Sequence, residues 1–252
     1  MNSQIDFGYP WWLSYGHLVV TALALTFWLL GRARKWSKVP MILIAALGLW
    51  SVAALAVARF GLDANGRLPL PTQKFLSSGG GRVLDMGAGT GRSTFMVLEA
   101  RPQATVVALD LFGESFKRHF GPGESGQERL LSNLKAAGLE RRATIQTGDM
   151  RKLPFEAATF DGVVSTYAID HLGRDGITAA LSEASRVLKP GGEFLMMVIA
   201  KDIWLKFAFG PLLLHSGTRS PERWTSLLQA AGFQMVEQGT RPGTLYFVAR
   251  KP

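Results

Sequence analysis

Three glycines at alternate positions follow a β-rich run near residue 83, and this segment has the residue types best suited to chemistry. It reads VLDMGAGTGRST over residues 83–94, with Asp85 followed by Gly87, Gly89 and Gly91. Glycine allows a sharp turn and a close approach of ligand to backbone. The free N–H groups at the start of a following helix favour an anionic group. The segment therefore predicts a strand, a ligand-binding loop and a helix.

The spacing of the glycines favours one kind of cofactor over another. The pattern is D-x-G-x-G-x-G, whereas dinucleotide-binding loops read G-x-G-x-x-G, so NAD and FAD are disfavoured. The second β-rich run ends at Asp110, 19 residues after Gly91. A carboxylate there can accept hydrogen bonds from both hydroxyls of a ribose. We expect Asp110 to hold a nucleoside, the alternative being a solvated acid at a strand end.

Short β-rich runs alternate with helical stretches from residue 82 onward. We expect strands over residues 82–86, 105–110, 143–147, 160–166, 193–199, 233–238 and 245–249, and helices over 90–100, 127–137, 176–188 and 221–231. This alternation predicts an α/β fold with a mostly parallel sheet covered on both faces. The last two runs are joined by GTRPG, which leaves no room for a crossover helix, so they should form an antiparallel hairpin.

Composition excludes several chemistries. The chain has 252 residues, of which 47% are hydrophobic and 19% charged, and it contains no cysteine. Disulfides, thiolate zinc sites, iron–sulfur clusters and cysteine nucleophiles are therefore excluded. The net charge is +9, yet no dense basic stripe with interleaved aromatic residues is present. We therefore expect no nucleic-acid partner and assign no metal site.

The first sixty residues predict a helical hairpin in a membrane. Residues 7–31 and 39–58 contain no Asp, Glu, Lys or Arg, and each run is long enough to cross about 30 Å of hydrocarbon. Trp11, Trp12 and Tyr15 are placed to form an aromatic belt at the lipid boundary. The alternative is a buried hairpin packed on a soluble domain. A cleaved signal peptide is disfavoured because the start lacks a basic region and contains Asp6.

The charges between the two apolar runs bear on orientation. Arg32, Arg34, Lys35 and Lys38 lie in the connection, and the positive-inside rule would place them in the cytoplasm. Two full crossings would then put the rest of the chain outside, where an intracellular cofactor is not normally found. Either the folded domain overrides the rule or the hairpin enters one leaflet and turns back. We expect membrane localisation with a cytoplasmic catalytic domain.

Turn-forming residues separate the hairpin from the rest of the chain. Residues 61–81 contain Pro69, Pro71 and the run SSGGG, which is typical of a linker. The predicted division is a membrane-anchoring hairpin over residues 1–60, a linker over 61–80 and a catalytic domain over 81–252.

From about residue 70 to 250 the chain resembles the class I S-adenosylmethionine-dependent methyltransferases, particularly those acting on small molecules and lipids. The motifs that carry the resemblance are VLDMGAGTG, VVALD, TGDMRKLPF, FDGVVSTYAIDHL and RVLKPGGEFLMM, in that order. The resemblance implies a Rossmann-like sheet of seven strands and S-adenosylmethionine as the cofactor. It says little about the methyl acceptor.

The resemblance also implies a set of cofactor-binding residues at the ends of the first four strands. These residues are Asp85, Gly87, Gly89, Gly91, Asp110, Leu111, Asp149, Met150 and Thr166. The glycines would line the methionine and ribose, with Asp85 ordering their loop. Asp149 would meet the amino group of adenine and Met150 its face. Thr166 and Tyr167 would border the methyl group.

Candidate catalytic residues follow the fourth predicted strand in STYAIDHL. His171 is placed to act as a general base near neutral pH if the acceptor is protonated, and Tyr167 or Asp170 would orient it or the substrate. The alternative for His171 is a helix cap or a structural hydrogen bond.

Two further segments are interpreted as additions around the mouth of the site. Residues 112–125 carry three phenylalanines at helical spacing beside Lys117, Arg118 and His119. Residues 203–215 are strongly apolar but too short to span a bilayer. The second segment would lie in the membrane interface or roof an apolar pocket, the alternative being ordinary core packing.

Together these features predict a membrane-anchored methyltransferase whose partners are membrane lipids and a lipophilic small molecule: a phospholipid amine, a quinone or phenol, or an apolar xenobiotic. A small thiol or volatile acceptor is the alternative among enzymes. Arsenic methylation is disfavoured because the family it resembles relies on cysteines. A non-catalytic cofactor-binding protein is the alternative of another class, and a dehydrogenase is disfavoured by the glycine spacing.

Overall fold

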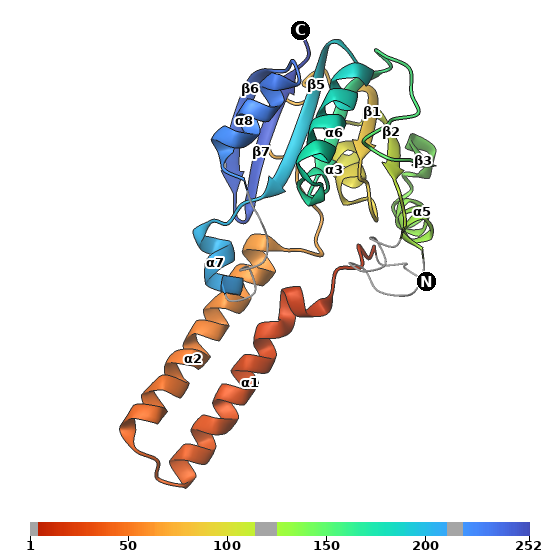
Figure 1. Ribbon diagram of the computed structural model, residues 1–252. Coiled ribbons are helices and arrows are strands. Elements are labelled where there is room, and N and C mark those ends of the chain that lie inside the picture. The colour runs from red at the N-terminus through yellow and green to blue at the C-terminus, as the bar shows by residue number, and fades with distance from the viewer. Residues whose placement is uncertain (1–4, 114–124, 211–218) are drawn as a thin grey trace. The chain divides into compact units, whose positions relative to one another are not determined.

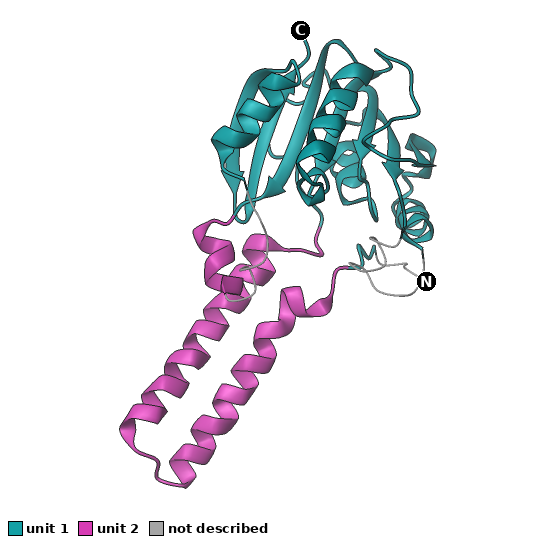
Figure 2. Ribbon diagram, in the orientation of Figure 1, with its two compact units in different colours: residues 1–8, 67–200, 217–252 teal, residues 9–66, 201–216 magenta. Residues whose placement is uncertain are grey.

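The computed structural model describes residues 5–113, 125–210 and 219–252 and divides into two compact units (Figures 1 and 2). The sheet unit comprises residues 1–8, 67–200 and 217–252, and the hairpin unit comprises residues 9–66 and 201–216. The predictions made for residues 114–124 and 211–218, which include His119 and His215, lie outside the described residues.

The sheet unit contains a seven-stranded sheet in the order β3-β2-β1-β4-β5-β7-β6. The strands are β1 Gly80–Met86, β2 Gln103–Asp110, β3 Ala143–Thr147, β4 Phe160–Thr166, β5 Leu188–Ile199, β6 Gln234–Arg241 and β7 Thr244–Arg250. β1 to β5 pair in parallel, whereas β7 runs antiparallel to both β5 and β6. The predicted mostly parallel sheet with an antiparallel C-terminal hairpin is confirmed.

Within the residues that the structure describes, four helices of the sheet unit connect these strands. They are α3 Arg92–Ala100, α5 Gly126–Ala137, α6 Arg174–Val187 and α8 Pro221–Ala230. Ser220 caps α8 by accepting from the backbone N–H of Arg223, and Pro221 occupies the first turn, where its missing N–H is not needed. Ser125 and Glu128 form a reciprocal capping box at the start of α5.

The two faces of the sheet pack against different helices. Leu84 and Met86 of β1 belong to a buried cluster with residues of α6 and α8, including Ile177 and Trp224. Figure 1 shows α6 and α8 over the same face. Because side chains alternate along a strand, Asp85 points to the opposite face, where its carboxylate bonds to the start of α3. Residues of β1 are thus buried on both sides.

Residues 6–8 pack on the sheet unit as an N-terminal strap. Phe7 is buried with its ring edge-on to Phe95, at 5.6 Å between centroids. Asn133 accepts from the Asp6 N–H at 3.0 Å and donates to the Asp6 carbonyl at 2.9 Å. The Thr90 hydroxyl donates to the Phe7 carbonyl at 2.8 Å. The strap is therefore bonded directly to the glycine loop.

The described part of the hairpin unit contains two long apolar helices and a short one. α1 spans Trp11–Ala33, α2 spans Lys38–Ala56 and continues as a π-helix over Val57–Leu62, and α7 spans Ile203–Phe209. α1 and the continuous helix Lys38–Leu62 are long and apolar enough to cross a membrane, by length and composition. Most of their large apolar side chains are exposed. The Ser51 hydroxyl joins the helices by donating to the His17 carbonyl at 3.2 Å.

Candidate active site

The glycine loop lies where β1 meets β2. The N–H groups of Gly87 and Ala88 donate to the Leu109 carbonyl at 2.8 and 3.1 Å, which closes the loop over the end of β2. Gly89 has a φ of +52°, and a Cβ placed there would point into open space. A Cβ at Gly87 would instead meet Ala168 and Met150. The loop thus leaves its backbone open to a ligand at Gly89 only because that residue lacks a side chain.

Asp85 lies beneath the loop and supports it. Its buried carboxylate accepts hydrogen bonds from the hydroxyls of Ser93, at 2.7 and 2.8 Å, and Thr94, at 2.6 Å. Burial raises the pKa of this carboxyl to about 7, against the lowering effect of the two hydroxyls. Because Ser93 and Thr94 lie in the first turn of α3, the Asp85 carboxylate of β1 lies next to the N-terminus of this helix, where a negative charge complements the helix dipole. Asp85 is therefore placed to hold the loop on the helix.

Asp110 ends β2 and is fixed by two backbone groups. One carboxylate oxygen accepts from the N–H of Gly89 at 2.9 Å, and the other accepts from the N–H of Phe112 at 2.9 Å. Carboxylate oxygens have further lone pairs, so Asp110 retains the capacity to accept from a ligand hydroxyl. The side chain predicted to hold a ribose thus stands beside the loop predicted to hold the same molecule.

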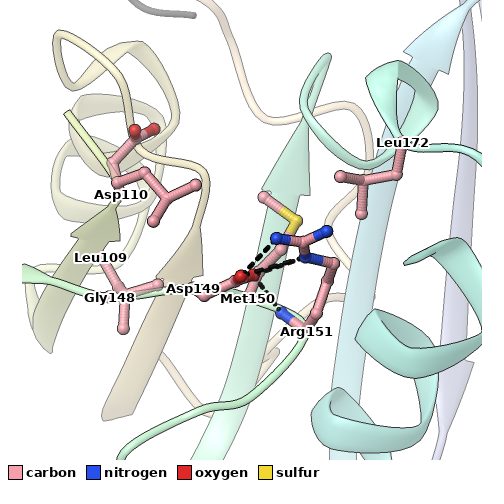
Figure 3. A pocket seen from close by; sticks show the side chains of 8 residues that line it. Leu109, Asp110, Gly148, Asp149, Met150, Arg151 and Leu172 are labelled. Atoms are coloured by element: carbon pink, nitrogen blue, oxygen red, sulfur yellow. Dashed lines mark hydrogen bonds and ion pairs between the residues drawn. The ribbon is translucent and has the colours of Figure 1, made fainter. Parts of the chain in front are cut away.

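A cavity of about 240 Å³ opens next to Asp110 (Figure 3). The cavity is lined by residues at the end of β2, by the turn that follows β3, and by one leucine that follows β4. The lining residues are Leu109, Asp110, Leu111, Gly148, Asp149, Met150, Arg151 and Leu172. Four of the predicted cofactor-binding residues, Asp110, Leu111, Asp149 and Met150, are brought together in this cavity.

Asp149 is engaged by its neighbour Arg151, as Figure 3 shows. The guanidinium donates to both carboxylate oxygens, with Nη2 to Oδ2 at 2.6 Å, and the Arg151 backbone N–H also donates. Hydrogen bonding from Arg151 lowers the pKa of Asp149. Arg151 was not among the residues predicted from the sequence. The sequence does contain a signal for its ion pair with Asp149, because in GDMR the arginine follows the acid by two residues. The pair fixes the carboxylate at the cavity wall.

The residues following β4 form a second group. Thr166 is buried at the strand end. Tyr167 has a φ of +52°, and its hydroxyl lies 2.6 Å from the Thr244 hydroxyl. Asp170 accepts from the Ile199 N–H at 3.2 Å through Oδ2, while its buried Oδ1 has no hydrogen-bond partner among the residues the structure describes. Asp170 therefore has a carboxylate oxygen available within a packed environment.

His171 ends the 3-10 turn Ile169–His171 and is exposed. The helix that follows, α6, has Gly173 as its N-cap residue and no side-chain cap. The alternative that His171 caps this helix is therefore wrong. Thr244, a residue of the C-terminal hairpin that was not predicted from the sequence, carries the partner hydroxyl of Tyr167.

The site fits an S-adenosylmethionine molecule in the chemistry of its donors. The backbone at Gly89 faces open space, the carboxylate of Asp110 can accept from hydroxyls, and the thioether of Met150 offers an apolar contact at the cavity wall. These features suit a nucleoside joined to a short charged chain.

Comparisons with known proteins agree with this geometry. A methyltransferase-domain family model matches residues 83–192. The chain is 34% identical over 181 residues to the ubiquinone/menaquinone biosynthesis C-methyltransferase of Dinoroseobacter shibae, covering 62% of this chain and 67% of that protein. It is 37% identical over 119 residues to the enzyme of the same name from Rhizobium leguminosarum, covering 47% of this chain and 41% of the relative. The matched segment thus spans less than half of the Rhizobium protein.

A solved structure shares the fold. The 1,6-didemethyltoxoflavin-N1-methyltransferase of Burkholderia thailandensis, with bound 1,6-didemethyltoxoflavin and S-adenosylhomocysteine, aligns with a TM-score of 0.51 at 22% identity, covering 68% of this chain and 71% of that one. Fold, site and relatives together define an S-adenosylmethionine-dependent enzyme. The chain belongs to the class I S-adenosylmethionine-dependent methyltransferases.

Proposed function

We propose that this methyltransferase is anchored in a membrane and transfers a methyl group to a lipophilic, quinone-type acceptor. One observation carries the proposal: the same chain contains the cavity beside Asp110 and two helices with exposed apolar side chains. The names of the relatives, which are quinone C-methyltransferases, support the choice of acceptor. A quinol with an isoprenoid tail is found in the lipid phase that such helices would occupy.

The chain's own residues would hold the cofactor and the acceptor. Bound S-adenosylmethionine supplies an activated methyl group on a sulfonium. The loop at Gly89 and the carboxylate of Asp110 would position its aminoacyl and ribose parts, and Met150 with the Asp149–Arg151 pair would contact its adenine. Positioning of this kind can lower the free-energy barrier to transfer by roughly 7 to 11 kcal/mol, so the protein does not need to form a covalent intermediate.

Methyl transfer to carbon needs one proton acceptor. Removing a phenolic proton would first make the ring more nucleophilic. A bond would then form between the methyl group and a ring carbon of the quinol as the bond from sulfur to the methyl group breaks. The ring carbon would lose its proton and the phenolate oxygen would regain one, so that one proton is released for each methyl group transferred. We assign the acceptance of a hydroxyl proton to Asp170, whose buried Oδ1 has no partner among the described residues. His171, being exposed, would pass the proton to water, and Tyr167 would border the methyl group.

A transfer assay tests this function. The 252-residue chain in lipid nanodiscs is incubated with methyl-labelled S-adenosylmethionine and with demethylated quinols that carry long or short tails, and with a small thiol in parallel. We expect label in the organic phase, on a ring carbon of the quinol by mass spectrometry. Label on the thiol alone, or cofactor binding without transfer to any acceptor, would contradict the proposal.

Membrane anchoring is tested separately. Because the large apolar side chains of α1 and α2 are exposed rather than buried, we expect the full chain to float with vesicles and to resist extraction at alkaline pH. The single-cysteine variant Lys35→Cys places a thiol in the connection between α1 and α2. Its labelling by a membrane-impermeant reagent shows on which side of the membrane this connection lies. In cells we expect the catalytic domain on the cytoplasmic side. Release of the protein by alkaline washing would contradict anchoring.

A further inference from the structure

α7 carries an apolar face that the hairpin unit leaves exposed. Ile203, Trp204 and Phe207 lie on one face, at spacings of three and four residues, and are 74%, 50% and 38% exposed. In the sequence, α7 follows β5 and so interrupts the sheet unit, but its packing places it in the hairpin unit. Ile203, Trp204 and Phe207 are called the α7 face below.

The backbone of α7 is bonded to the hairpin at its C-terminal end. The carbonyl of Ala208 accepts from His17 Nε2 at 2.9 Å, and the carbonyl of Phe207 accepts from Trp50 Nε1 at 3.2 Å. The last carbonyls of any helix have no partner within the helix. Here side chains of α1 and α2 satisfy two of them. Since no water is present in hydrocarbon to bond an unsatisfied carbonyl, this arrangement suits a helix that lies in a water-poor environment.

The position of these bonds along the hairpin gives the depth of α7. His17 is 15 residues from Arg32 and Trp50 is 12 residues from Lys38, which places α7 about 18 to 22 Å from the charged connection. A hydrocarbon core is about 30 Å thick. The C-terminal end of α7 therefore lies about 10 Å inside the far boundary of a spanning hairpin, a depth typical of interfacial helices.

Residues near α7 mark that boundary. Arg59, 21 residues after Lys38, donates to the Tyr15 hydroxyl at 3.1 Å and pairs with Asp63 at 2.8 Å. Phe60, in the π-helix of the same unit, is 82% exposed. Lys206 is an exposed cation flanking the α7 face. Apolar side chains next to cations and a tyrosine match the chemistry of the lipid headgroup boundary.

We propose that the α7 face inserts into the boundary between headgroups and acyl chains of a phospholipid bilayer, as a third membrane contact beside the hairpin. This inference rests on the membrane anchoring proposed above. It is supported by the exposed apolar side chains that α1 and α2 carry in the same unit, by the depth of the bonds from His17 and Trp50 to α7, and by the cations Arg59 and Lys206. A roof over an apolar substrate pocket is the competing role.

The absence of cysteine from the chain makes a direct test possible. Single cysteines replace Ile203 in α7, Leu43 in the hairpin and Leu131 in α5, all three exposed in the structure. Each variant of the full chain is labelled with an environment-sensitive fluorophore and reconstituted in phosphatidylcholine vesicles with one-fifth phosphatidylglycerol. Spin-labelled lipids, with the nitroxide near the headgroup or deep in the chain, then report proximity and depth. Lys206→Cys is a matched control on α7 itself.

The proposal predicts blue-shifted emission and strong quenching at 203 by the shallow nitroxide, and quenching at 43 by a nitroxide within the chains. The label at 206 should be quenched less than that at 203, and the label at 131 should be unaffected. Quenching at 43 without quenching at 203 would overturn the role of α7 and leave the anchor intact. Quenching at neither position would overturn both. A blue-shifted label at 203 that only an added short-chain quinol quenches would instead assign α7 to the substrate pocket.

Discussion

The backbone N–H of Gly89 donates a hydrogen bond to the carboxylate of Asp110, 21 residues further along the chain, at 2.9 Å. The bond joins the loop after β1 to the end of β2, which are neighbouring parallel strands. The second oxygen of Asp110 accepts from Phe112, so the carboxylate is held on both sides. The carboxylate is therefore held in one orientation in the absence of a ligand, which would lower the entropy lost if it binds a ribose, as proposed.

Replacing Asp110 should weaken cofactor binding. A hydrogen bond to a charged group contributes about 1.5 to 3 kcal/mol, so Asp110→Asn should raise the Kd for S-adenosylmethionine at least about tenfold. Asp161→Asn is a suitable control, because Asp161 lies at the other end of β4 and pairs with Lys189. Titration calorimetry checks both variants. An unchanged Kd for Asp110→Asn would show that the ribose is held elsewhere.

Gly89→Ala should block the cofactor through its new side chain. A matched control is Gly138→Ala, because both glycines have positive φ, +52° and +67°, and neither added Cβ would meet another atom within 4 Å. Each substitution should therefore lower stability by a similar amount, roughly 1 kcal/mol. Only Gly89→Ala should also reduce cofactor affinity. Equal affinities in the two variants would mean that the space at Gly89 is not used.

The glycine loop and Asp110 were predictable because their signal is local. The run D-x-G-x-G-x-G and the acid at the end of the next strand are each read within a few residues, and the topology of parallel strands then brings strand ends together. Asp149 and Met150 were predicted from a motif that is equally local. Arg151 was not, because its role depends on a turn geometry that brings its guanidinium onto Asp149.

The place of α7 could not be predicted by pattern alone. Its bond to His17 joins residues 191 apart in the sequence, and no periodicity signals a contact of that range. The apolar composition of residues 203–209 is equally consistent with core packing, a pocket roof or an interfacial helix. For the same reason the strap at Phe7, held by Asn133 and Thr90, was not foreseen.

The buried Asp85 should make stability depend on pH. Burial raises its folded-state pKa to about 7 from the ordinary value of 3.8, so the folded protein retains a proton that the unfolded chain releases between these values. The stability that comes from keeping Asp85 protonated in the folded state is fully present below about pH 4, and it is lost as the pH rises to about 7. Across that interval the free energy of unfolding should fall by about 1.4 kcal/mol for each pH unit.

Asp85→Asn should remove that dependence. The hydroxyls of Ser93 and Thr94 can reverse and accept from an amide, so the variant keeps a bonded loop. Denaturant unfolding of the full chain in detergent, at pH 4.5 and 7.5, should show a smaller difference between the two pH values for Asp85→Asn than for the parent. Parallel pH profiles would mean that Asp85 titrates alike in both states.

If Asp170 accepts the hydroxyl proton of the quinol, as proposed, substitution of Asp170 should lower kcat more than substitution of His171. Removal of a general base lowers kcat by about 10² to 10⁴, so Asp170→Asn should lose activity to that extent while the Kd for the cofactor is unchanged. His171→Gln, at an exposed position, should lose less activity. Transfer rates measured between pH 5.5 and 9 with the quinol acceptor check both. A larger loss in His171→Gln would assign the base to His171.

The N-terminal strap should couple to the cofactor loop through Phe7. Its ring is buried against Phe95 and its carbonyl accepts from Thr90, which lies between two glycines of the loop. Truncation of a buried phenylalanine to alanine typically destabilises by about 3 to 5 kcal/mol, enough to release a short segment held by a few hydrogen bonds. Phe7→Ala should therefore weaken S-adenosylmethionine binding and expose the strap to proteolysis, whereas Phe7→Leu should retain most of both properties. Calorimetry and limited proteolysis of the full chain measure the two effects. If Phe7→Ala frees the strap without changing cofactor affinity, the bond from Thr90 serves packing alone.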